Sequence, residues 1–183
     1  MLEEVILVDA HDTHIGTMEK LEAHEKGLLH RAFSILLVNE RGEMLLQQRA
    51  LGKYHSPGLW TNACCSHPRP NETNLEAANR RLQEELGMSV SMTEIFQFTY
   101  RAELEYGLIE HEIDHVFLGL TNENPRINLL EVMSYKWMNL SELQQDMIAH
   151  PEKYTAWFNL LMVDHYSSIE NALKHESKET SYL

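Results

Sequence analysis

The chain of 183 residues has the length of one compact domain, since domains commonly run to about 100–200 residues. Its 43% hydrophobic and 23% charged residues are a globular composition and exclude a disordered chain. A net charge of −13 opposes binding to nucleic acid or to anionic membranes, so neither is expected as a partner. An anionic small ligand would need clustered basic side chains or a divalent metal.

The chain is expected to be cytoplasmic and to form a single domain over residues 1–183. No apolar run approaches the ~18 residues that cross a bilayer, and residues 1–4 lack the basic and apolar segments of a secretory signal. The two cysteines, Cys64 and Cys65, are adjacent, and such neighbours rarely form a disulfide. Any role they have is expected to be that of free thiols in a reducing compartment.

The N-terminal part of the chain is predicted to be mostly strands. Residues 4–9 alternate as a strand, a loop containing His and Gly follows over residues 11–17, and an irregular polar stretch comes next. Residues 32–38 and 43–49 are predicted to pair as a hairpin, because residues 39–42 between them have turn chemistry.

A long irregular segment and a well-marked helix follow. Residues 52–74 are rich in Gly, Pro, Asn, Cys and His, and a loop this long within a compact domain is usually functional. Residues 73–76 have the pattern of a capping box, apolar residues recur along one face of residues 75–86, and Gly87 supplies a stop. This punctuation predicts a helix.

The rest of the chain is predicted to contain strands and then helices. Residues 95–102 and 112–120 alternate as paired strands, and residues 134–138 form a short third one. Residues 140–149 begin a helix with an acidic first turn, and residues 156–173 form a longer C-terminal helix. This order of elements predicts an α+β fold, a mixed α/β sandwich.

Glu110 and Glu112 are the first candidate functional pair. In an extended segment they point to the same face, and two carboxylates on one face repel unless a cation or a proton lies between them. Taken alone, the pattern is more typical of a solvated strand edge.

Cysteine and histidine provide further candidates. Cys65 and His67 lie two residues apart in the proline-rich segment, where a thiol and an imidazole could bind a metal or transfer a proton; a buried inert cysteine beside a surface histidine is the alternative. His24 and His30 are six residues apart, so loop structure would have to unite them. Three His nitrogens and two carboxylate oxygens form a ligand set suited to Zn²⁺, Mn²⁺ or a similar ion rather than Ca²⁺.

Four basic residues could bind an anion, since arginine offers a planar fork to phosphate oxygens: Lys20, Arg49, Lys53 and Arg81. Alternatively they are scattered surface cations, and Arg81 with Glu85 forms an i,i+4 pair that only braces a helix.

Read together and in order, these stretches resemble the type I isopentenyl-diphosphate isomerases. The matching segments are residues 16–20 with His24, 30–34, 48–53, 57–62 through His67 and Pro68, 80–87 and 110–112. They extend over residues 4–165, and separated matches in the family's order argue against coincidence.

The resemblance implies a Nudix-like fold, with sheets flanked by helices, and the isomerisation of isopentenyl diphosphate to dimethylallyl diphosphate. It implies one Mn²⁺, Zn²⁺ or Mg²⁺ ion held by His24, His30, His67, Glu110 and Glu112. It also implies a second ion, Mg²⁺, that bridges the substrate diphosphate to Glu85 and the backbone carbonyl of Cys65. The residues at the family's diphosphate-binding positions are Lys20, Arg49, Lys53 and Arg81.

The same resemblance implies that Cys65 and Glu112 face each other across the substrate. One delivers and one removes a proton through a tertiary carbocation, in an order that the sequence leaves open. Tyr100 matches a residue that hydrogen-bonds this carboxylate, and Trp157 matches an aromatic whose π-face stabilises the cation. Without the family, Trp157 is better explained as a core anchor of the last helix. The expected partner is a small prenyl diphosphate, and the expected state is a monomer or weak dimer.

Two alternatives follow from departures in the pattern. The helix also looks like a modified Nudix box, in which Arg80, Glu84, Glu85 and Gly87 fit. Arg81 stands where Nudix hydrolases carry a metal-binding Glu, which argues against diphosphate hydrolysis, and Ser66 stands where the isomerases usually have Gly. A Nudix-type diphosphate hydrolase is therefore the main alternative, and an inert metal- or ligand-binding domain is the second.

Overall fold

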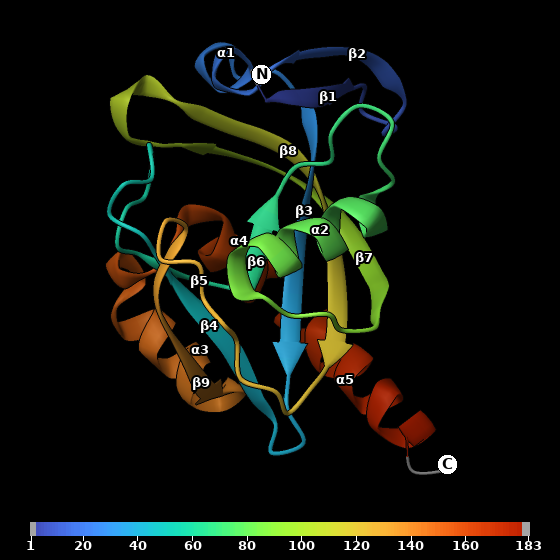
Figure 1. Ribbon diagram of the computed structural model, residues 1–183, viewed down its shortest axis with the longest axis vertical. Coiled ribbons are helices and arrows are strands. Elements are labelled where there is room, and N and C mark those ends of the chain that lie inside the picture. Colours follow the sequence, from blue (N-terminus) through green and yellow to red (C-terminus); the bar gives the residue numbers. More distant parts are fainter. Residues whose placement is uncertain (1–2, 181–183) are drawn as a thin grey trace.

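The computed structural model of the chain describes residues 3–180, with side chains up to residue 175 (Figure 1). Its strands are β1 (Glu4–Val8), β2 (His14–Glu19), β3 (His30–Val38), β4 (Glu43–Arg49), β5 (Trp60–Thr61), β6 (Cys64–Ser66), β7 (Met92–Glu103), β8 (Ile109–Leu120) and β9 (Val132–Asn139). Its α-helices are α1 (Lys20–Lys26), α2 (Asn74–Leu86), α3 (Leu140–Ala149), α4 (Ala156–Asp164) and α5 (Tyr166–Thr180).

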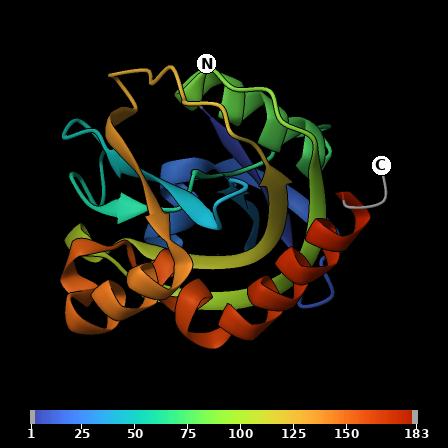
Figure 2. The same cartoon turned by 90° about the horizontal axis from the view of Figure 1, so that it is seen from below.

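The described strands form one mixed sheet in which β3 is the central element. β3 pairs with β8 in parallel and with β1, β4 and β6 in antiparallel fashion. β7 extends the sheet beyond β8, while β5 and β9 both pair with β4. Helix α2 covers one side of the strands and α3, α4 and α5 the other (Figure 2). The predicted α+β architecture, a sheet flanked by helices, is therefore confirmed.

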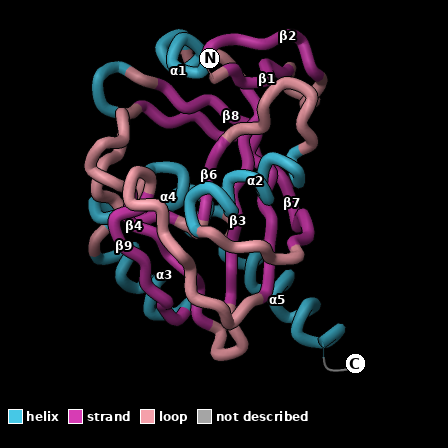
Figure 3. The backbone as a smooth tube through the Cα atoms, in the orientation of Figure 1, coloured by secondary structure: helices cyan, strands magenta, loops and turns pink. Residues whose placement is uncertain are grey.

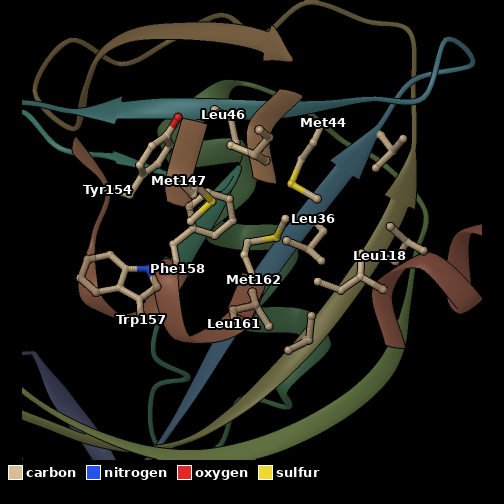
Figure 4. Close-up of a cluster of buried hydrophobic side chains, with 14 of the residues drawn as sticks. Leu36, Met44, Leu46, Leu118, Met147, Tyr154, Trp157, Phe158, Leu161 and Met162 are labelled. Atoms are coloured by element: carbon tan, nitrogen blue, oxygen red, sulfur yellow. The ribbon is translucent and has the colours of Figure 1, made fainter. Parts of the chain in front are cut away.

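The core lies on both faces of β3, because side chains alternate along a strand. Leu36 packs with Trp157 and Phe158 of α4 in one buried cluster (Figure 4). Phe33 and Leu37 belong to a second cluster, under α2. Burial on both faces explains why β3 has a nearly continuous apolar sequence rather than an alternating one. Each fully buried Leu or Phe stabilises the fold by about 1.5–3 kcal/mol.

Several predicted elements are confirmed with small shifts of their ends. The helix after residue 73 has its capping box, with Thr73 and Glu76 exchanging hydrogen bonds, and it ends at Gly87 in the left-handed conformation. The helix at residues 140–149 has the predicted bounds. The two central strands of the predicted hairpin are present, but they pair only beside the turn, at Val38 and Met44, and then separate.

Other predictions were wrong. Residues 14–17 lie in β2, paired with β1, and not in a loop, because the tight turn after β1 returns the chain along it. The irregular stretch that follows contains α1, and the long loop over residues 52–74 contains β5 and β6 (Figure 3). The predicted C-terminal helix is interrupted at His165, whose ring packs against Phe96 and Phe98 at centroid distances of 5.1 and 4.6 Å.

None of the helices within residues 3–180 is long and apolar enough to cross a bilayer. The single domain over residues 1–183 stays a prediction, and its residues 1–2 and 181–183 lie outside the described range.

The capping box of α2 gives a first prediction. Thr73→Ala removes the oxygen that accepts the backbone N–H of Glu76, and we expect the free energy of unfolding to fall by about 1 kcal/mol. Thr73→Ser keeps that oxygen and should stay near the wild type. Urea unfolding measures both variants, and equal stability of the Ala variant and the wild type would contradict the role of the cap.

Candidate active site

Four buried side chains that can bind a metal converge at one end of β3. His24 comes from α1, His30 opens β3, His67 follows β6, and Glu112 lies in β8. The parallel register of β3 and β8 places His30 directly opposite Glu112. One ligand atom from each of the four residues lies within 4.8 Å of the others. The fold therefore unites residues that are up to 88 positions apart in sequence, from His24 to Glu112.

The imidazole nitrogens Nε2 all point at one carboxylate oxygen. Glu112 Oε1 lies 3.9 Å from Nε2 of His24, 3.3 Å from that of His30 and 3.0 Å from that of His67. Nδ1 of His24 donates to the carbonyl of Lys20 at 2.7 Å, and Nδ1 of His30 donates to that of Leu28 at 2.8 Å. These bonds fix the tautomer in which each Nε2 presents a lone pair.

The chemistry of this cluster fits a divalent metal. Burial lowers the pKa of His24 and lowers that of His67 to about 3, which keeps both rings neutral, as metal binding requires. Burial opposes ionisation of Glu112, but its contacts with His30 and His67 outweigh burial and hold its pKa well below the usual value. Within the described residues, the buried Nε2 of His24 has no hydrogen-bond partner. Neutral nitrogens and one carboxylate suit Zn²⁺ or Mn²⁺.

Glu110 is beside this cluster but not in it. The hydroxyl of Tyr100 donates to Glu112 Oε2 at 2.6 Å and contacts Glu110 Oε2 at 3.2 Å. Burial and the neighbouring charge of Glu112 raise the pKa of Glu110 well above normal. The pKa values of the two carboxyls are thus driven in opposite directions. The predicted role of Glu110 as a metal ligand stays a prediction.

The cluster borders a pocket that is partly open to solvent. Cys65 and Glu112 both line it, so the thiol and the carboxylate share one cavity. The lining residues are Lys20, Arg49, Lys53, Tyr54, His55, Cys65, Ser66, His67, Arg81, Glu110, Glu112 and Trp157.

The adjacent cysteines face opposite sides of the sheet, because side chains alternate along β6. Cys64 is fully buried in the cluster under α2, where burial and the nearby charge of Glu85 raise its pKa well above normal. Cys65 faces the pocket and packs against the cluster under α4. Burial, followed by the nearby carboxyls of Asp114 and Glu112, raises the pKa of Cys65 well above normal.

The predicted anion-binding residues also meet at this pocket. Burial lowers the pKa of Lys20, and the nearby charges of Lys53 and Arg81 lower it further, although Glu3, 3.3 Å from its Nζ, opposes the shift. Glu131 Oε2 lies 2.5 Å from Lys53 Nζ and 3.4 Å from Arg81. Cations this close repel one another, and an anion among them would be stabilised.

Arg49 is the fourth member of the basic group, and hydrogen bonds to backbone carbonyls hold its side chain in place. Its guanidinium donates to the carbonyls of His55 and Ser56 at 3.0 and 3.2 Å and lies 5.2 Å from the centre of the Trp157 ring. Trp157 is buried and lines the pocket as well as the core, so the two explanations of this residue are compatible.

Glu85, the predicted ligand of the second ion, lies on α2 and is not among the lining residues. Its carboxylate accepts a hydrogen bond from Gln47 Nε2 at 2.8 Å and forms an ion pair with Arg81. The predicted contact of a second ion with Glu85 and the carbonyl of Cys65 stays a prediction.

Two residues of the pocket wall and two behind it were not predicted from the sequence. Tyr54 and His55 line the pocket, and their place in the long proline-rich segment was the available signal. Ser34 and Asp114 are fully buried behind Cys65. Asp114 follows Glu112 by two residues and so shares its face of β8, which was the signal for it.

Comparison with known proteins identifies the family. Residues 28–158 match the NUDIX domain. The chain is 54% identical over 159 residues to the isopentenyl-diphosphate Delta-isomerase of Pectobacterium atrosepticum, covering 87% of this chain and 89% of that one. It is 49% identical to the protein of the same name from Serratia proteamaculans, covering 90% and 92%. The chain belongs to the isopentenyl-diphosphate Delta-isomerase family.

Solved structures agree with the NUDIX fold of this isomerase family. A crystal structure from Deinococcus radiodurans aligns with a TM-score of 0.67 and 18% identity, over 80% of this chain and 90% of that one. The MutT protein from Methanosarcina mazei Go1 aligns with a TM-score of 0.59 and 22% identity, over 72% and 88%. Identities this low show the fold alone, and the predicted Nudix-like fold is confirmed.

Metal binding is testable directly. We expect Mn²⁺ or Zn²⁺ to stabilise the protein by about 2.7 kcal/mol at 100 times the dissociation constant. His30→Ala removes one nitrogen of the cluster and should weaken the affinity by about 100-fold or more. Calorimetric titration and metal analysis measure this effect. His14→Ala changes an exposed histidine and should bind as the wild type does; equal binding by His30→Ala would contradict the site.

A dependence of stability on pH follows from His55. Burial and the charge of Arg49 lower its pKa to about 2, whereas an unfolded histidine titrates near about 6.5. The unfolded state therefore binds the extra proton below pH ~6.5, and stability falls as the pH drops through that value.

His55→Phe keeps a ring against Trp157 and Tyr54 but removes this titration. Urea unfolding from pH 7.5 to 5 should show a shallower loss of stability in the variant, by up to about 1.4 kcal/mol per pH unit. Parallel curves would contradict the buried neutral state of His55.

Proposed function

We propose that this protein converts isopentenyl diphosphate into dimethylallyl diphosphate by acid–base catalysis between Cys65 and Glu112. The observation that carries the proposal is that this thiol and this carboxylate line one pocket, together with the basic side chains that an organic diphosphate requires. Family membership supports it, since relatives at 54% and 49% identity over most of the chain are named as this isomerase.

The reaction moves a double bond by one position. A proton is added to the terminal CH₂ of the alkene, which leaves a tertiary carbocation, and a proton is removed from the CH₂ next to the cationic carbon. Cys65 and Glu112 perform these two steps, one as the acid and the other as the base. Since the net composition is unchanged, no oxidant or co-substrate is consumed.

Proton transfer on Glu112 depends on the different groups that its two carboxylate oxygens contact. Oε2 accepts the short hydrogen bond of the Tyr100 hydroxyl, and Oε1 faces the imidazoles of the metal-type cluster, which consists of His24, His30, His67 and Glu112. A divalent ion there, bound by His24, His30, His67 and Glu112, would withdraw charge from the carboxyl and strengthen it as an acid. We propose Mn²⁺, Zn²⁺ or Mg²⁺ for this position, with Glu110 as a further ligand.

The pocket must exclude water, because water would trap a carbocation. Trp157 forms an apolar wall and offers a π-face, an attraction of about 2 kcal/mol or more for a desolvated cation. The guanidinium of Arg49 lies over the same indole, 5.2 Å from the ring centre, and lines the same pocket.

The diphosphate is proposed to bind to Lys20, Arg49, Lys53 and Arg81. Mutual repulsion among Lys20, Lys53 and Arg81 is relieved when an anion joins them, so the protein itself favours the negatively charged end of the substrate. A Mg²⁺ ion carried with the diphosphate, near Glu85 and the carbonyl of Cys65, belongs to the same proposal.

Hydrolysis is the weaker alternative because of Arg81. In Nudix hydrolases this position of the helix holds a metal-binding Glu; here its guanidinium pairs with Glu84, at 2.9 Å, and with Glu85. A fixed positive charge at this point disfavours the additional metal ions that hydrolysis uses.

Incubation of the purified metal-loaded protein with isopentenyl diphosphate in deuterated water, followed by NMR, tests the proposal. We expect dimethylallyl diphosphate with deuterium in a methyl group. Release of phosphate would instead indicate a hydrolase, and unchanged substrate that still binds would indicate an inert binding domain.

Substitutions test whether Cys65 and Glu112 are the two reacting groups. Cys65→Ala and Glu112→Gln should each reduce turnover by about 10²–10⁴-fold while the fold is retained, because each removes a proton donor or acceptor. Cys64→Ala is the matched control and should be nearly silent, since Cys64 faces α2 and not the pocket. Full activity of Cys65→Ala would contradict the proposed mechanism.

A further inference from the structure

Two buried polar side chains behind the pocket have no part in the mechanism above. Ser34 in β3 and Asp114 in β8 are both fully buried, and the Ser34 hydroxyl donates to Asp114 Oδ2 at 2.8 Å. The other oxygen of Asp114, Oδ1, is buried and has no hydrogen-bond partner among residues 3–175.

Ser34 and Asp114 lie in a row with the thiol of Cys65. β6, β3 and β8 are neighbouring strands, and Cys65 in β6 is directly opposite Ser34 in β3. Residues directly opposite on neighbouring strands have adjacent side chains on one face, so the Ser34 side chain lies beside that of Cys65, and Asp114 accepts the hydroxyl proton of Ser34. A polar row of Cys65, Ser34 and Asp114 therefore crosses the sheet.

Stability does not account for this row. Val116 and Leu118 follow Asp114 at alternate positions of β8 and belong to the apolar cluster on that face. A buried carboxyl with one unpaired oxygen costs about 1–3 kcal/mol relative to a satisfied one. An apolar side chain at position 114 would be expected to stabilise the fold, so another use of the carboxyl is indicated.

We propose that Ser34 and Asp114 are positioning residues that hold the sulfur of Cys65 in its reacting orientation. The inference rests on the proposed function. A hydroxyl has one proton and two acceptor lone pairs, so Ser34 can donate to Asp114 and at the same time accept from the thiol of Cys65. Asp114 thereby anchors the oxygen of Ser34. The sulfur is thus held in one orientation before it transfers its proton.

Turnover tests this role through the separation of kcat from KM. Ser34→Ala and Asp114→Val should lower kcat by roughly 10- to 100-fold, the cost of a misplaced reacting group. KM should stay within about twofold, because the diphosphate is bound by other residues. Asp114→Asn keeps an oxygen that accepts from Ser34 and should retain most of the activity.

A matched control distinguishes positioning from a general loss of stability. Tyr154→Phe also deletes a hydroxyl that donates to a carboxylate, that of Asp146 at 2.5 Å, but this bond lies away from Cys65. Its kcat should equal that of the wild type. If Tyr154→Phe loses as much activity as Ser34→Ala, or if Ser34→Ala keeps full kcat, the positioning role is overturned.

A measurement without substrate separates this inference from the proposed function. In a Cys64→Ala background Cys65 is the remaining thiol of the sequence, and its alkylation by iodoacetamide can be followed at one pH. Ser34→Ala should slow alkylation by about threefold or more, because the sulfur is no longer held in the orientation that faces the pocket. An unchanged or faster rate overturns the role of Ser34. Slower alkylation in a protein that produces no dimethylallyl diphosphate would instead refute the proposed function alone.

Discussion

The site depends on the convergence of imidazole nitrogens on one oxygen of Glu112, and that convergence depends on β3. This strand carries His30, pairs in parallel with β8 to bring in Glu112, and pairs with β6, after which His67 follows at once. His24 joins from α1, which ends at Gly27 in the left-handed conformation only three residues before β3 begins. Strand register is thus the constraint that creates the metal-type cluster.

Burial then gives these groups the properties that the chemistry needs. In a chain of net charge −13, the pocket gathers basic side chains opposite the carboxyls of Glu110 and Glu112. Burial lowers the pKa of His67 to about 3, and burial together with the charge of Glu112 raises the pKa of Glu110 while that of Glu112 is lowered. In water the two carboxyls would ionise alike. The burial that packs the core therefore also shifts the pKa values of the site.

Local patterns predicted what local interactions determine. The cap at Thr73 and the stop at Gly87 define α2 because both act within one turn of the helix. The break at His165 depends on the aromatic rings of Phe96 and Phe98 in β7, so the apolar pattern of the helix itself could not predict it. Convergence of His24 and His30 likewise required tertiary structure, and the family resemblance alone brought them together in the sequence analysis. A buried Asp114 resembles a solvated strand residue until the strand's neighbours are known.

The two adjacent cysteines lie on opposite sides of β6. Cys64 contacts Glu85 on the helix that carries the Nudix-box residues, while Cys65 faces the pocket beside the metal-type cluster. α2 keeps the structural part of the box, its cap and its buried apolar face, but Arg81 places a positive charge among its carboxylates. A strand of three residues, β6, therefore separates the side of the fold under α2 from the side that holds the pocket. Because side chains alternate with period two, a shift of one residue in β6 would turn Cys65 toward α2 and Cys64 toward the pocket.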